Sequence, residues 1–188
     1  MKKFSVLALV AVVAAVCACK EEKVVDPFQE ALIAELQKQF TEDFVSVEFQ
    51  LFEKIDSSTY NDELLRRKKV FEVKAEQDEI MYNKYVGEKK PKNASIQHEK
   101  VLKDRAVLVK LDSLAESFGS HAEDIAFYDF HFSVLAKGKS AVMKLDDAYA
   151  CITPSYEVVG LTTKQRDIHK ATGKAVPGYM DIIKDDNE

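Results

Sequence analysis

Residues 125–136, IAFYDFHFSVLA, decide the fold, because two kinds of side chain alternate along them. Successive side chains of a β-strand point to opposite faces of the sheet. One face of this stretch carries Tyr128, Phe130, Phe132 and Val134, and the other carries Phe127, Asp129, His131 and Ser133. The alternation predicts a strand whose apolar face has to be covered by another part of the chain.

Further short strands are predicted after this one. Turn residues at 137–139, at Asp146-Asp147 and at Pro154-Ser155 separate segments that can pair back on one another. The expected strands are residues 125–136, 141–145, 149–153 and 156–161. This region therefore predicts an antiparallel meander, with residues 176–184 as an edge strand or an extended tail.

Helical periodicity dominates the chain before Gly119. Asp26, Pro27 and Gln29 form a helix start, with an N-cap, a proline at the first helical position and a capping glutamine. Apolar side chains then recur at steps of three or four residues from Phe28 to Ile55. This spacing predicts one long helix.

A strand is the alternative for part of this segment. Val45, Val47, Phe49 and Leu51 alternate with polar residues, as they would in a half-buried strand. We prefer the helix because neither glycine nor proline occurs between residues 28 and 86.

Two further helices are expected before the sheet. Ser58 or Thr59 can cap a helix that runs to about Val86. Asn93 or Ser95 can start the next helix, for which Gly119 is a fitting stop. The sequence thus predicts an α+β fold, in which about three N-terminal helices, including a long helical hairpin, pack on a small C-terminal antiparallel meander. We expect one domain over residues 26–188, helical over 26–118 and sheet-rich over 119–184.

The N-terminus has the pattern of an export signal. Lys2 and Lys3 precede an uncharged apolar run over residues 4–16, which is the length of a signal-peptide core and shorter than the roughly 20 residues that span a bilayer. The residues Val16-Cys17-Ala18-Cys19 then resemble the lipobox of bacterial lipoproteins, with an aliphatic residue at −3 and a small residue at −1.

The lipobox resemblance implies a lipid anchor. In that family the cysteine thiol receives a diacylglyceryl group, the signal peptide is removed, and the new amino group is acylated. Residues 1–18 would be the signal, Cys19 the acylated residue and residues 19–25 a short tether. Cys17 is the alternative site, which would put the larger Val16 at −1. Several acyl chains hold a protein stably on a membrane that it does not span.

The residues after Cys19 indicate a location. Lys20-Glu21-Glu22 resembles the surface-export signal of Bacteroidota lipoproteins, and no aspartate follows Cys19 directly. The resemblance implies an outer-membrane lipid anchor, with exposure at the cell surface as a further expectation. Membrane lipid, contacted through acylated Cys19, is therefore one expected partner.

Charge and cysteine content narrow the function. Loss of Lys2 and Lys3 with the signal leaves 25 basic and 32 acidic residues, a net charge of −7. This balance argues against nucleic acid as a partner. Cys151 is then the remaining thiol beside lipidated Cys19, so no intrachain disulfide is expected.

Few residues suggest chemistry. Asp129 and His131 lie two apart on the predicted strand, so they share a face and form a candidate zinc pair; a polar outer face is the interpretation that we prefer. Cys151 could be a nucleophile if a base lay beside it, but we expect a buried small residue. No known catalytic motif occurs, and we expect neither catalytic residues nor a cofactor.

These patterns favour a membrane-anchored envelope lipoprotein without enzymatic activity, which contacts a protein partner or supports an assembly at the outer membrane or cell surface. One alternative is a ligand-binding accessory protein for glycan or peptide uptake. The other alternative is a metal-dependent or cysteine-dependent hydrolase.

Overall fold

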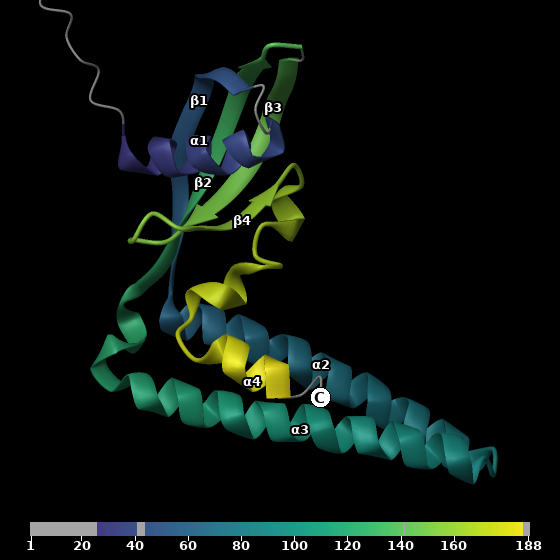
Figure 1. Cartoon of the computed structure of the whole chain (residues 1–188). Helices are drawn as coiled ribbons and strands as arrows, with labels where there is room; N and C mark the ends of the chain where they lie inside the picture. Colours follow the sequence, from purple (N-terminus) through teal and green to yellow (C-terminus); the bar gives the residue numbers. More distant parts are fainter. Residues whose placement is uncertain (1–25, 41–43, 141, 186–188) are drawn as a thin grey trace, which may run out of the picture.

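The computed structural model describes residues 26–40, 44–140 and 142–185. Four α-helices, four strands and short 3-10 turns make up this part of the chain (Figure 1). In chain order they are α1 (Pro27–Phe40), β1 (Phe44–Thr59), α2 (Tyr60–Gly87), α3 (Pro91–Phe118), η2 (Gly119–Glu123), β2 (Ile125–Gly138), β3 (Val142–Ile152), β4 (Val158–Thr162), η3 (Gln165–Asp167), η4 (Thr172–Ala175) and α4 (Tyr179–Asp185).

The strands form one antiparallel sheet in the order β1-β2-β3-β4. Strands β1 and β2 are neighbours in this sheet, although α2 and α3 lie between them in the sequence. The chain is therefore α+β, as predicted, with a helical hairpin inserted between two adjacent strands. The predicted order, helices first and sheet afterwards, is wrong because β1 precedes the hairpin.

The long helix predicted over residues 28–55 is also wrong. Helix α1 ends at Phe40, and β1 begins at Phe44. The strand pairs with β2 along its length, with register shifts between Phe49 and Leu51 and between Lys54 and Asp56. Each shift changes which face the following residues occupy, so the side chains that pack on the core are Val47, Phe49 and Phe52, at a two-residue and then a three-residue step.

Strand β3 differs from the prediction too. Residues Asp146-Asp147 do not turn the chain, because β3 continues from Val142 to Ile152. The ladder instead has an irregularity there, since Phe132 pairs with Ala148 and Val134 with Leu145. A bulge thus accommodates the two acidic residues inside a single strand.

Helix α1 covers one face of the sheet (Figure 1). Its side chains Leu32 and Leu36 are fully buried against Phe130 and Phe132 of β2. The ring of Phe28 lies 5.1 Å from that of Phe130, measured between centroids. The apolar face predicted for β2 is therefore covered by the first helix, rather than by the hairpin.

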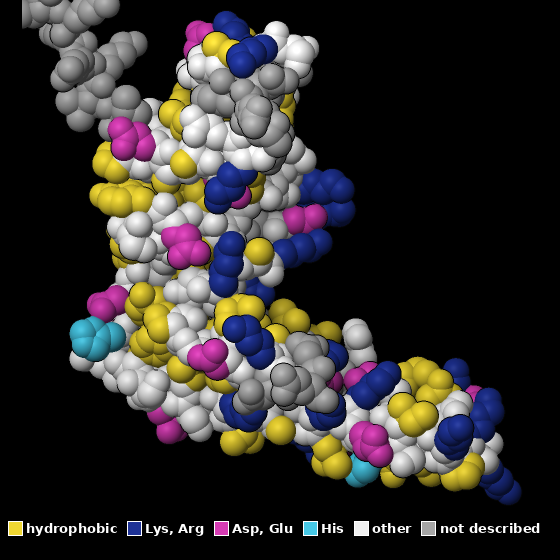
Figure 2. All heavy atoms as spheres, in the orientation of Figure 1, with side chains coloured by type: hydrophobic (Ala, Val, Ile, Leu, Met, Phe, Trp, Pro, Cys, Tyr) yellow, Lys and Arg dark blue, Asp and Glu magenta, His cyan; other side chains and the backbone are white. Residues whose placement is uncertain are grey.

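The α2–α3 hairpin projects from one end of the sheet as an arm (Figures 1 and 2). Each helix has 28 residues, which at 1.5 Å per residue makes it about 42 Å long. Near the sheet, Leu64 of α2 packs on Val107 and Leu111 of α3. The predicted cap at Thr59 is confirmed, and Gly119 ends α3 with a φ of 50°.

The C-terminal segment folds back onto this arm. Residues 176–184, predicted as a strand or a tail, instead contain α4. Val176 and Tyr179 are buried in the same cluster as Leu64 and Leu111. The helix forms because residues spaced at three and four positions can then face the base of the arm. In residues 26–40, 44–140 and 142–185, no helix is long and apolar enough to cross a membrane.

The capping box at the start of α2 gives a pH-dependent prediction. Thr59→Ala should lower the free energy of unfolding by about 1 kcal/mol at neutral pH, because the Thr59 hydroxyl accepts a hydrogen bond from the Asp62 amide. Hydrogen bonds from the Thr59 backbone and side chain lower the pKa of Asp62. The folded pKa then lies below the unfolded one, so this contribution is complete above the unfolded pKa and is lost as the pH falls through the folded pKa.

Urea unfolding of both proteins at about pH 7 and about pH 3 tests the capping prediction. The difference in unfolding free energy between wild type and Thr59→Ala should shrink at the lower pH. An equal difference at both pH values would contradict it.

Candidate functional site

The residues predicted for lipid attachment, Cys19 and Cys17, lie outside the described part of the chain. The candidate metal pair lies within it, on β2. Asp129 and His131 do share a strand, but each is hydrogen-bonded to different residues. The structure therefore assigns the two side chains to separate clusters.

His131 lies between two carboxylates. Its Nδ1 is 3.0 Å from Glu53 on β1, and its Nε2 is 2.6 Å from Asp147 on β3. Its ring stacks on Tyr149, with centroids 4.9 Å apart. The hydrogen bonds to Glu53 and then Asp147 raise the pKa of His131 above its ordinary value. The carboxylates flank opposite ring nitrogens, so this cluster links three strands and is not arranged around one ion.

Asp129 instead joins Cys151 and His169. The Cys151 thiol donates to Oδ1 of Asp129 at 3.1 Å, and Nε2 of His169 lies 2.7 Å from Oδ2. Asp129 and Cys151 are buried, whereas the His169 side chain is 27% exposed. One thiol, one carboxylate and one imidazole thus meet at a site that opens to solvent on the His169 side.

The sheet register explains this meeting. Asp129 on β2 pairs with Cys151 on β3, and Cys151 pairs with Gly160 on β4. A Cβ atom at Gly160 would lie 3.0 Å from the backbone oxygen of Ile168. Because glycine leaves that space open, the segment after η3 can lie against the sheet and bring His169 to Asp129.

The carboxylate of Asp129 lies between the Cys151 thiol and the His169 imidazole, and this arrangement argues against Cys151 as a nucleophile. The Asp129 carboxylate bonds both the thiol and the imidazole, whereas an activated cysteine needs the base itself at the thiol. Burial, and after it the charge of Asp129, raises the pKa of Cys151 well above its ordinary value. A protonated thiol is a poor nucleophile.

A buried ionic network fixes the backbone beside this cluster. Glu63 of α2 is fully buried and is bonded to Arg66, to Arg67 at 2.6 Å and to the Thr172 hydroxyl at 2.8 Å. Arg67 also donates to the backbone oxygen of His169 at 2.5 Å. The network therefore attaches the segment that carries His169 to the base of the arm.

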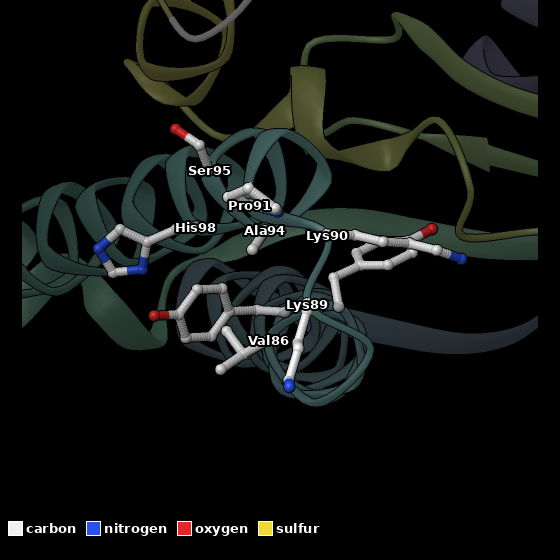
Figure 3. Close-up of a pocket in the computed structure, with 9 residues that line it drawn as sticks. Val86, Lys89, Lys90, Pro91, Ala94, Ser95 and His98 are labelled. Atoms are coloured by element: carbon white, nitrogen blue, oxygen red, sulfur yellow. The ribbon is translucent and has the colours of Figure 1, made fainter.

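A cavity of about 580 Å³ lies at the opposite end of the arm, where α2 turns into α3 (Figure 3). The rings of Tyr82 and His98 lie across the hairpin from each other, 5.1 Å apart between centroids. The cavity is lined by Tyr82, Tyr85, Val86, Lys89, Lys90, Pro91, Ala94, Ser95 and His98. The cavity therefore combines apolar side chains with lysines at the tip of the arm.

Comparisons of the chain with protein-family models, with curated proteins and with solved structures find no match. The fold therefore defines the class of this protein: it is an α+β chain with a long helical arm between the first two strands of its sheet.

Proposed function

We propose that the chain is a membrane-anchored envelope lipoprotein whose α2–α3 arm contacts another protein through its tip. The observation that carries this proposal is the cavity at the end of the arm (Figure 3), where the α2–α3 turn lies remote from the sheet (Figure 1). The resemblance of Val16-Cys17-Ala18-Cys19 to a lipobox supports the anchor, which would be acylated Cys19 at the outer membrane.

The arm has the surface expected of a contact element. Several of its apolar side chains are exposed by about half, although the two helices already pack on each other. Among them are Ile80 at 61%, Val86 at 52%, Ile96 at 48% and Leu102 at 52%. Exposed apolar groups that gather on one element favour a binding surface. The arm is therefore the part of the chain best suited to a protein partner.

The tip also indicates the chemistry of that partner. Lys89 and Lys90 rim an apolar cavity, and Figure 2 shows Lys and Arg side chains beside apolar ones at the end of the arm. This local positive charge contrasts with the net charge of −5 for the whole chain. A protein segment with an apolar anchor side chain and nearby acidic residues complements such a site.

A ligand-binding accessory role is the second candidate. The volume of about 580 Å³ lies within the range of about 300–1,000 Å³ that is usual for small-ligand sites. Tyr82 and Tyr85 could stack on a sugar or pack on a peptide. Saturable binding of short glycans or peptides, lost in a tip variant, would favour this role over a protein contact.

A double charge change tests the tip. Val86→Glu with Lys89→Glu places a negative charge in the apolar wall of the cavity and reverses the sign of the charge at its rim. Burial of one valine contributes about 1.5–3 kcal/mol, so partner recovery after cross-linking in the native envelope should fall about tenfold or more.

The matched control is Val142→Glu with Lys139→Glu, since Val142 is 64% exposed at the far end of the sheet. This control should leave partner recovery unchanged. Equal recovery from the tip variant and from wild type would overturn the proposal.

A further inference from the structure

We propose that Asp129, Cys151 and His169 form a binding site for a zinc-type divalent ion. This inference is independent of the role of the arm. It rests on three donor atoms, one from each side chain, that all lie within 4.8 Å of one another. The three residues come from β2, from β3 and from the segment after η3, so an ion would join parts of the chain that are distant in sequence.

The donor distances suit a tetrahedral ion. With a Zn–S bond of about 2.3 Å and Zn–N and Zn–O bonds of about 2.0 Å, neighbouring donors are about 3.3–3.5 Å apart. The thiol sulfur now lies 3.1 Å from Oδ1 of Asp129, and the imidazole nitrogen lies 2.7 Å from Oδ2 of the same carboxylate. Separation of each pair by about half an ångström would therefore make room for the ion.

The types of donor select the ion. A thiolate and an imidazole favour zinc and its neighbours among the transition metals, whereas magnesium and calcium prefer oxygen donors. On binding, the thiol proton leaves to solvent, and the proton that Nε2 of His169 donates to Asp129 moves through solvent to Nδ1, so that Nε2 offers its lone pair to the ion. One thiolate and one carboxylate then balance the two charges of the ion.

The surroundings hold the donors in place. The backbone oxygen of His169 accepts a hydrogen bond from Arg67 at 2.5 Å. This contact fixes the backbone from which the imidazole of His169 projects. Three protein ligands with solvent on the His169 side leave a fourth position for water.

Cobalt(II) is the probe, because a bound thiolate gives it a charge-transfer band and tetrahedral coordination gives it strong visible bands. The full chain carrying Cys17→Ser and Cys19→Ser leaves Cys151 as the single thiol. We expect saturation at one cobalt per chain under reducing conditions, displacement by zinc and no displacement by magnesium. Zinc should also raise the melting temperature of this protein.

Three variants of that chain complete the test. Cys151→Ala should abolish the charge-transfer band, and His169→Gln should weaken binding about tenfold or more, since the loss of even an outer-shell partner of a ligand commonly costs about 10–100-fold. His121→Gln, at an exposed histidine bonded to Asp124, should bind as before. Circular dichroism establishes that each variant is folded. The absence of saturable binding, or a thiolate band that persists in Cys151→Ala, would overturn the proposal.

Discussion

Glu63→Gln should lower the free energy of unfolding by about 3–5 kcal/mol, which is the usual cost of breaking a buried ion pair from one side. Glu63 is fully buried, and Arg67, one of its two arginine partners, has a side chain that is only 12% exposed. The amide keeps the shape of the side chain but leaves both guanidinium groups without their carboxylate. A loss this large would remove much of the 5–15 kcal/mol that stabilises a typical domain.

Urea unfolding of wild type and variant measures this loss, with Glu72→Gln as the matched control. Glu72 lies on the same helix and is exposed, so its change should stay within about 0.5 kcal/mol. If Glu63→Gln also changed stability by less than about 1 kcal/mol, the buried network would not be what attaches the C-terminal segment to the arm.

A double-mutant cycle separates the Glu63–Arg67 pair from its surroundings. Glu63→Gln and Arg67→Met each remove one side of the pair, and the double variant removes both. The sum of the two single losses of unfolding free energy should exceed the loss in the double variant. In the double variant neither member of the pair remains buried without the other. Strict additivity would mean that the two side chains act independently.

Cys19→Ala should abolish membrane association of the protein. Each buried CH₂ of an acyl chain contributes about 0.8 kcal/mol, and stable anchoring needs more than one chain. Without Cys19, the acylated residue in our proposal, no acyl chain would hold the protein. Radiolabelled palmitate and fractionation of washed membranes measure the two consequences together.

Cys17→Ala is the matched control for the anchor. It alters the neighbouring cysteine and leaves the aliphatic Val16 at −3 and the small Ala18 at −1 of Cys19 in place. Labelling should persist in this control and disappear in Cys19→Ala. Label that remained in Cys19→Ala but vanished in Cys17→Ala would move the acylated residue to Cys17.

Local patterns predicted the parts of the fold that local physics determines. The alternation in residues 125–136 predicted β2, and the capping residues predicted the start of α2 at Tyr60. The helical arm follows from residues that repeat at three- and four-residue steps. Near the sheet the predicted positions Leu64, Val107 and Leu111 are buried, whereas Ile96, farther along the arm, is 48% exposed.

The errors at β1 and β3 have a common physical origin in strand pairing. The bulges of β1 depend on its partner β2, which is more than 60 residues away along the chain. They disrupt the two-residue alternation in a way that resembles helical spacing. Likewise, the acidic pair Asp146-Asp147 signals a turn locally but occupies a bulge in β3, because β3 pairs with β2 on both sides of it.

The candidate sites were harder to predict from the sequence than the helices and strands. Asp129 could be singled out from its strand, but its partner His169 approaches it only because the segment after η3 packs over Gly160. Nothing in the spacing of the two residues marks that contact. The tip cavity similarly depends on how Tyr82 of α2 and His98 of α3 oppose each other across the turn.

The most direct test of the central claim is site-specific photo-cross-linking in intact cells. A photoreactive residue at Val86, at the tip of the arm, is compared with one at Val142, at the end of the sheet; both positions are more than half exposed. The arm hypothesis predicts a discrete adduct from Val86, absent from Val142 and lost when Lys89→Glu is added. A discrete adduct from Val142 with none from Val86 would contradict it.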